Sequence, residues 1–190
     1  FMQAVIKGDA FIQRFPVGSN NPTTTKEIDA SSLWEKIVHN AWKSAEPGIL
    51  FWDTIKRESV ADCYEDEGFG TVSTNPCGEI PLCPYDSCRL LAINLLSFVN
   101  NPFSEEAEFD FVKFKRYVRM AQRIADNIID LELEKIDSIL EKIGNDPESK
   151  EIKRTERNLW LNIKEKCQNG RRTGTGITAE GDMLAALGLT

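Results

Sequence analysis

The sequence predicts an α/β fold in which parallel strands alternate with helices. Apolar residues recur with helical spacing over residues 33–45 and again from Asp110 onward. Short apolar runs at 49–52 and 89–99 have the length of buried strands, although periodicity alone leaves the second run open to a helix. Such alternation favours parallel strands joined by helices. The sequence offers too few strand candidates for a complete barrel, so we expect the chain to form only part of a barrel.

The N-terminal third is predicted to hold a helix, a short strand and a loop. The stripe at 33–45 predicts a helix, which Ser31 or Ser32 is expected to cap. Pro47 and Gly48 follow the stripe and are expected to end that helix. The remaining expectations here are a helical start in "FMQAVIKGDAF", a buried strand at 49–52 and a polar loop at 61–74.

The C-terminal half reads as mainly helical. Asp110 has the position of a helix N-cap, and Phe109 and Phe114 have the spacing of a hydrophobic staple. Helical patterning continues to about Gly144, where "GNDP" breaks the chain. The later expectations are a charged outer helix at 148–168, a turn or strand in "RRTGTGIT", and a short helix at 179–188. We interpret residues 132–168 as a charged helical insertion.

Composition places the chain among globular proteins. Its 190 residues are 41% hydrophobic and 28% charged, with a net charge of -7 that argues against non-specific binding to nucleic acid or acidic membranes. No apolar run approaches the roughly 18 residues of a membrane span, and no secretory signal is recognisable. An odd number of cysteines, five, fits a reducing cytoplasm. Because the chain starts at Phe1 within a helical pattern, we expect a fragment of a longer protein.

The segment "STNPCGEIPLCPYDSC", residues 73–88, holds the densest chemistry of the chain. Pro76 biases the preceding residue toward an extended conformation, which predicts that Asn75, Cys77 and Glu79 point to one side. Three uses of the thiol remain open: a nucleophile, a metal ligand, or a donor of a hydrogen atom. The nucleophile lacks a nearby base, and the cysteine spacing is not that of zinc sites, so no metal ligand is assigned. A neutral thiol between an amide and a carboxylate suits hydrogen-atom chemistry, but an ordinary loop fits the spacing as well.

Two features outside this segment also have alternative interpretations. The arginines of "RRTGTG", Arg171 and Arg172, are expected to meet either acidic side chains or a phosphate. Cys83 is expected to be buried or incidental, and Cys167 to be structural or exposed.

Four motifs in order along the chain resemble the large, catalytic chains of ribonucleotide reductases. "NPCGEIPL" resembles their active-site loop, and "CRLLAINL" resembles their second cysteine stretch, with Arg89 and Leu91 where Asn and Gly are usual. The flanking segments "EPGILFWDTIKRES" and "GRRTGTGITAEGDMLAALG" are similar to the family's flanking segments. The short step from the loop to "PYDSC" looks most like the class II branch, which depends on adenosylcobalamin.

The resemblance implies part of a ten-stranded α/β barrel that reduces ribonucleotides to 2'-deoxyribonucleotides. It implies a thiyl radical on Cys77, a proton acceptor in Glu79, a hydrogen-bonding amide in Asn75, and a redox thiol in Cys88. It also implies a ribonucleoside di- or triphosphate substrate, nucleotide effectors bound outside this chain, a thioredoxin-like reductant and a possible homodimer. The partner thiol of Cys88 is not recognisable upstream.

Three other functions remain open at this stage. They are a class I chain with a separate metal-radical subunit, a thiol-nucleophile enzyme, and a non-catalytic scaffold. We expect these 190 residues to be inactive in isolation.

Overall fold

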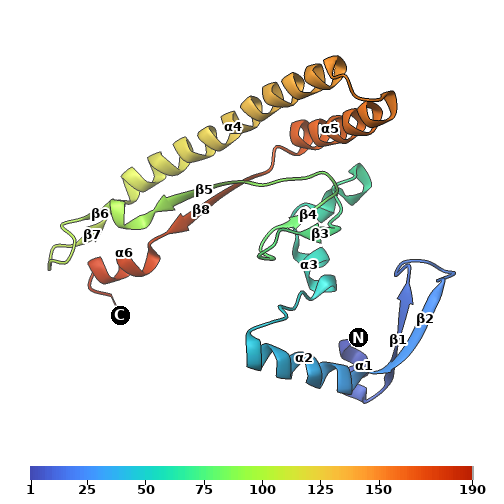
Figure 1. Ribbon diagram of the computed structural model, residues 1–190. Helices are drawn as coiled ribbons and strands as arrows, with labels where there is room; N and C mark the ends of the chain where they lie inside the picture. Colours follow the sequence, from blue (N-terminus) through green and yellow to red (C-terminus); the bar gives the residue numbers. More distant parts are fainter. Residues whose placement is uncertain (190) are drawn as a thin grey trace. The chain divides into compact units, whose positions relative to one another are not determined.

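The computed structural model describes residues 1–189, which divide into two compact units, Phe1–Trp52 and Asp53–Thr190 (Figure 1). Each unit is described by itself below. Within the described residues the strands form four two-stranded sheets, and these do not close into a barrel. The expected α/β content is therefore present, whereas the complete ten-stranded barrel of the resemblance is not seen in this chain.

The first unit is a β-hairpin with two helices. The helix α1 (Met2–Lys7) is followed by the antiparallel strands β1 (Ala10–Phe15) and β2 (Thr24–Asp29), and α2 (Ala30–Ser44) packs against α1. The predicted helix at 33–45 is confirmed, but its predicted cap is wrong. Asp29 caps α2, because it ends β2 with an extended backbone and its Oδ1 accepts a hydrogen bond from the Ser32 N–H at 2.6 Å.

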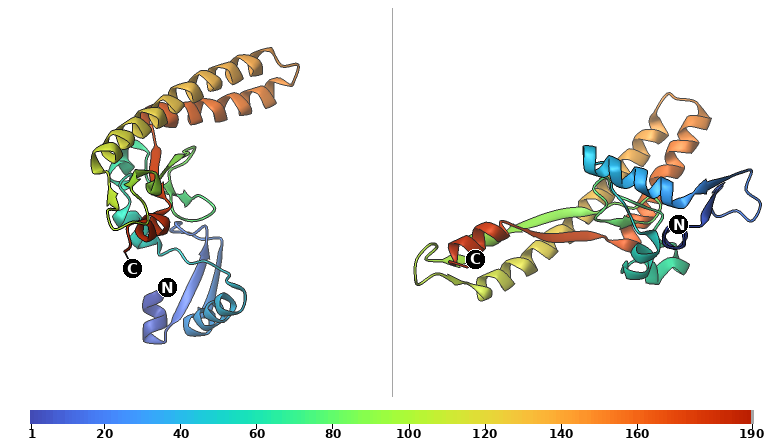
Figure 2. Two further views of the ribbon diagram at one scale, coloured as in Figure 1. Left: turned by 90° about the vertical axis from the view of Figure 1, so that its left-hand side faces the viewer. Right: turned by 90° about the horizontal axis from the view of Figure 1, so that it is seen from below.

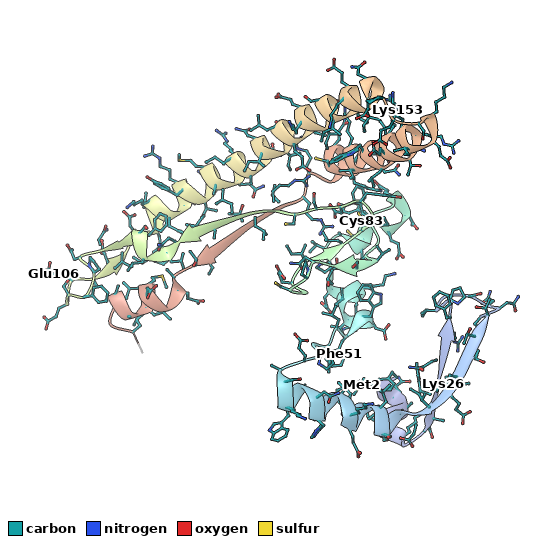
Figure 3. The ribbon with its side chains drawn as sticks, in the orientation of Figure 1. Met2, Lys26, Phe51, Cys83, Glu106 and Lys153 are labelled. Carbon is teal, nitrogen blue, oxygen red and sulfur yellow. The ribbon has the colours of Figure 1, made fainter. Side chains whose placement is uncertain are left out.

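The predicted buried strand at 49–52 is wrong. Residues 46–51 have no regular structure, and Trp52 begins α3 (Trp52–Glu58). Phe51, labelled in Figure 3, is 54% exposed. A buried strand requires a partner for its backbone groups and a surface for its side chains, and among the described residues this segment has neither.

The second unit begins with short elements that lead to the cysteine-rich segment. A 3-10 helix, η1 (Asp62–Glu67), and β3 (Ser73–Thr74) lie where a loop was predicted, and β3 pairs antiparallel with β4 (Pro81–Leu82). Asp62 fixes this region, because its carboxylate accepts hydrogen bonds from both the N–H and the hydroxyl of the buried Thr71.

The centre of the second unit is a parallel strand pair joined by two long helices. The strand β5 (Arg89–Asn94) lies beside β8 (Thr173–Thr178), with Arg89 opposite Thr173, and α4 (Phe111–Asn145) and α5 (Lys150–Gly170) form the connection (Figures 1 and 2). This confirms the predicted parallel pairing. The run at 89–99 divides into β5, a 3-10 helix η2 (Leu95–Phe98) and the start of β6 (Val99–Asn100), which pairs with β7 (Glu108–Phe109).

A small aromatic core fixes α4 on the strands. Ile93, Phe98 and Ala121 are buried, and Phe109 and Phe114 pack around them. The predicted cap and staple are both confirmed. Asp110 Oδ1 accepts from the Lys113 N–H at 2.8 Å, and the Phe109 and Phe114 ring centroids lie 5.4 Å apart.

Beyond the strands, α4 and α5 pack side by side as an antiparallel hairpin, clearest in the left view of Figure 2. The buried residues of α4 follow a helical stripe of Ala121, Ala125, Ile129, Ile136, Leu140 and Ile143. The charged helix predicted at 148–168 corresponds to α5, and the helix predicted at 179–188 to α6 (Glu180–Ala186). Among the described residues, no helix combines the length and apolarity needed to cross a bilayer.

Candidate active site

The segment around Cys77 is a turn rather than an extended strand, so the prediction that three side chains share one strand face is wrong. The Gly78 N–H donates to the Asn75 carbonyl at 3.0 Å, which closes a four-residue turn with Pro76 and Cys77 at its centre. Gly78 has φ 82°, a conformation that glycine adopts without strain. The signal was present in the sequence, because Asn, Pro and Gly occupy the first, second and fourth positions that they favour in type I turns.

Asn75 closes the wider loop between β3 and β4. Its backbone N–H donates to the Ile80 carbonyl at 3.2 Å, and its side-chain Oδ1 accepts from the Ile80 N–H at 3.0 Å. The amide oxygen is therefore engaged within the loop, which leaves the NH2 group as the part that can donate to a substrate. Asn75 is half-buried, consistent with this structural use.

Cys77 and Glu79 are both exposed on this loop. A thiol at the centre of a tight turn presents its sulfur outward, where a second molecule can reach it. Glu79 lies close enough to Cys88 that its negative charge is one of the influences that raise the pKa of the Cys88 thiol. The fold therefore brings the loop of Cys77 and Glu79 near the second predicted thiol.

Cys88 lies just before β5 and is half-buried. Burial raises the pKa of its thiol, Arg172 and Arg89 oppose that rise, and the carboxylates of Asp86 and Glu79 add to it. The thiol therefore stays protonated above its ordinary pKa, as a hydrogen donor requires.

Gly174 on β8 makes room for the Cys88 sulfur. A Cβ at this position would lie 3.1 Å from Cys88 Sγ and 2.7 Å from Leu90 Cδ2. Gly176, two residues further along the same strand, has nothing within 4 Å of such a Cβ. The absence of a side chain at Gly174 thus lets β8 lie close to the Cys88 thiol.

Arg89, one of the two residues that depart from the pattern of the second cysteine stretch, is the best-connected side chain of the site. Its side chain is 8% exposed, and its Nε donates to Glu132 Oε2 on α4 at 2.6 Å. Its Nη2 donates to Cys167 Sγ on α5 at 3.1 Å, and its Nη1 to the Ser87 carbonyl at 3.0 Å. Sequence analysis missed this network, because Glu132 and Cys167 are far from Arg89 along the chain and no local pattern joins them.

Both arginines of the "RRTG" segment meet carboxylates, which confirms the first of the two alternatives for them. Arg171 contacts Asp126 at 2.8 Å and Asp130 at 2.9 Å, and Arg172 contacts Asp86 at 2.7 Å. Of the three remaining thiols, Cys63 is exposed and two are buried: Cys83, labelled in Figure 3 just after β4, is 4% exposed, and Cys167 is 3% exposed.

Comparison with known sequences gives one consistent family. The family described as "Ribonucleotide reductase, barrel domain" matches residues 4–190. A "Vitamin B12-dependent ribonucleoside-diphosphate reductase" of Thermoplasma acidophilum is 37% identical over 133 residues, which are 65% of this chain and 16% of the relative. The reductase of the same name from Mycobacterium tuberculosis is 30% identical over 173 residues, 89% of this chain and 20% of that protein. A "Vitamin B12-dependent ribonucleotide reductase" of Streptomyces clavuligerus is 32% identical over 121 residues.

The matched residues correspond to a minor part of these relatives, at most 20% of the length of each. The match nevertheless includes both units described above and every predicted site residue. The chain belongs to the ribonucleotide reductase family and represents part of its barrel domain.

Proposed function

We propose that this chain supplies the active-site loop of an enzyme that reduces ribonucleotides to 2'-deoxyribonucleotides. The observation that carries the proposal is the joint placement of an exposed thiol, Cys77, on a tight turn and a second, half-buried thiol, Cys88, at the start of β5. The family match over residues 4–190 supports the same reaction.

In this reaction Cys77 acts as a thiyl radical that takes the 3'-hydrogen atom of the ribose. Glu79 accepts the proton of the 3'-hydroxyl, which helps the 2'-hydroxyl to leave as water. Asn75 donates from its amide NH2 to the substrate hydroxyls while its oxygen keeps the loop closed. The exposure of Cys77 and Glu79 supports these roles, since both groups are open to a substrate.

Cys88 and a second thiol outside the described residues supply the two reducing equivalents. The two sulfurs then form a disulfide, and a thioredoxin-like dithiol reduces that disulfide to restart the cycle. The half-buried position of Cys88 and the elevated pKa of its thiol support its role as a hydrogen donor.

We also propose that the complete enzyme belongs to the adenosylcobalamin-dependent class. The named relatives are described as vitamin B12-dependent. When bound, adenosylcobalamin supplies the radical that removes the hydrogen atom from the Cys77 thiol. An exposed sulfur at the centre of a turn would be accessible to such a radical source. The diphosphate in the names of the first relatives favours a ribonucleoside diphosphate over a triphosphate as substrate.

The test is deoxyribonucleotide formation by the complete natural protein with a dithiol reductant, with and without adenosylcobalamin. We expect activity only with the cofactor and its loss in Cys77→Ser. Cys63→Ser is the matched control, since Cys63 is an exposed thiol of the same unit to which the proposal gives no role.

Two results would change the assignment. Activity that requires a metal-bearing subunit in place of the cobalamin would move the protein to class I and keep the roles of the three loop residues. Activity that survives Cys77→Ser would exclude Cys77 as the radical site.

A further inference from the structure

Two adjacent arginines, Arg171 and Arg172, have different surroundings in this structure. Arg171 points to α4, where its guanidinium contacts Asp126 and Asp130. Arg172 points to the cysteine-rich segment instead. The two arginines have the same charge, but Arg171 binds a helix, whereas Arg172 reaches the candidate active site.

Arg172 joins two parts of the cysteine-rich segment with one side chain. Its Nη1 donates to the Pro81 carbonyl at 2.9 Å, and its Nε lies 2.7 Å from Asp86 Oδ2. The Asp86 side chain is 3% exposed and that of Arg172 19%. Asp86 Oδ2 accepts no hydrogen bond with good geometry from the described residues, so its contact with Arg172 is an ion pair without a hydrogen bond. A carboxylate this deeply buried depends on that cation.

The two partners of Arg172 lie between the two candidate thiols along the chain. Pro81 begins β4, directly after the loop of Cys77, and Asp86 precedes Cys88 by two residues. The parallel register places Arg89 opposite Thr173, so the residues just before them, Cys88 and Arg172, come together where the strands begin. A Cβ added to Gly174 would lie 3.1 Å from Cys88 Sγ, so the sulfur lies on the side of β8 to which a side chain at position 174 would point.

The charges around Cys88 make Arg172 the main cation near its sulfur. Burial opposes ionisation of the thiol, and so do the carboxylates of Asp86 and Glu79. Arg172 and Arg89 favour ionisation, with Arg172 the stronger influence. Both arginines are also paired with a carboxylate, Arg89 with Glu132 and Arg172 with Asp86.

We propose that Arg172, held by Asp86 and by the Pro81 carbonyl, is a positioning residue that keeps a fixed cation beside the Cys88 sulfur. This inference rests on the proposed redox function of Cys88. When a thiolate of the dithiol reductant attacks the partner sulfur of the Cys88 disulfide, a new S–S bond forms there. The old bond breaks and Cys88 leaves as a thiolate with the electron pair. Arg172 stabilises that departing thiolate, and a better-stabilised thiolate leaves faster.

The test measures how Cys88 ionises, without any need for turnover. The reduced complete protein is treated with iodoacetamide over a series of pH values, and the label on Cys88 is quantified by peptide fragmentation in a mass spectrometer. In Arg172→Gln we expect the midpoint of the Cys88 profile to rise by about one pH unit, or roughly tenfold less label below the midpoint. Arg172→Lys retains the charge and should keep the midpoint close to that of the wild type.

Arg171→Gln is the matched control, since it removes an equal charge one residue away and should leave the Cys88 profile unchanged. Superimposable profiles for Arg172→Gln and the wild type would overturn the proposal. So would equal shifts in Arg172→Gln and Arg172→Lys, which would indicate a structural role alone.

Unfolding would change the labelling of Cys88 in the opposite direction, because it speeds the labelling of every thiol, including the buried Cys167. If Arg172→Gln raises labelling of Cys167, the Cys88 profile of Arg172→Lys is used instead. A midpoint equal to that of the wild type supports the proposal, and a raised midpoint overturns it. A wild type inactive with cobalamin would refute the proposed function instead, and the labelling readout would be unaffected.

Discussion

The two candidate thiols differ in how the fold holds them. Cys77 is exposed on a turn that is stabilised by hydrogen bonds within its own loop, chiefly those of Asn75. Cys88 is half-buried, packs against Gly174, and precedes Arg89, whose side chain reaches both long helices. One thiol is thus held by local contacts and the other by long-range ones.

This difference suits the two roles proposed for the thiols. A radical site must be open to both substrate and cofactor, so its support comes from the backbone of its own turn. A thiol that cycles between reduced and disulfide forms benefits from a fixed position and a controlled charge environment. We therefore expect substitutions at the Cys77 loop to change activity with little effect on stability, and substitutions around Cys88 to change stability.

The largest effect is expected for Cys77→Ser. This change should lower deoxyribonucleotide formation by the complete protein at least about a thousandfold, because serine does not form the corresponding radical. Its free energy of unfolding should change by no more than about 0.5 kcal/mol, as is usual for exposed positions. Product assays and urea unfolding measure the two quantities. A large loss of stability would contradict the view that the Cys77 turn supports itself.

The next effect is expected for Arg89→Ala, which leaves Glu132 without its partner. The Arg89 side chain is 8% exposed and that of Glu132 32%, so the loss of this partly buried, charged hydrogen bond should cost about 2–3 kcal/mol. Urea unfolding of the complete protein measures this loss. Arg57→Ala is the control, because Arg57 pairs with Glu58 on the surface, where such pairs contribute little. Equal midpoints for the two variants would mean that Arg89 does not hold the helices on β5.

A smaller effect is expected for Gly174→Ala. The added methyl group would displace the end of the exposed Leu90 side chain and press on the Cys88 sulfur, which should cost about 1–2 kcal/mol, toward the low end for overpacking. Gly176→Ala on the same strand is the control, because its methyl group enters open space. Thermal unfolding should separate the two variants, and indistinguishable melting temperatures would show that Cys88 is not packed against β8.

The smallest effect is expected for Asn75→Ala, which removes the acceptor for the Ile80 N–H. Loss of one such hydrogen bond is worth about 1 kcal/mol. Hydrogen exchange at the Ile80 amide should therefore quicken several-fold, whereas Asn75→Asp, which keeps an oxygen acceptor, should exchange nearly as the wild type does. Unchanged hydrogen exchange at Ile80 in Asn75→Ala would mean that the Asn75 side chain does not stabilise the loop.

The sequence by itself determined those features that depend on neighbouring residues. The helix at 33–45 and the cap and staple formed by Asp110, Phe109 and Phe114 follow from short-range spacing, whereas periodicity left the run at 89–99 open between strand and helix. The resemblance at "NPCGE" and the family also came from local motifs. The turn at Cys77 was equally local, yet the bias of Pro76 on its preceding residue was read as extended while the Asn-Pro-x-Gly pattern was overlooked.

Only the tertiary structure decided the features that join distant residues. Asp29 caps α2, in place of the predicted serines, because β2 ends at that residue. Residues 49–52 form no strand because they have no partner strand among the described residues. The contacts of Arg89 with Glu132 and of Arg172 with Asp86 link residues 43 or more positions apart. A buried charge is satisfied by whichever opposite charge the fold brings close, and that choice is made by packing and not by spacing along the chain.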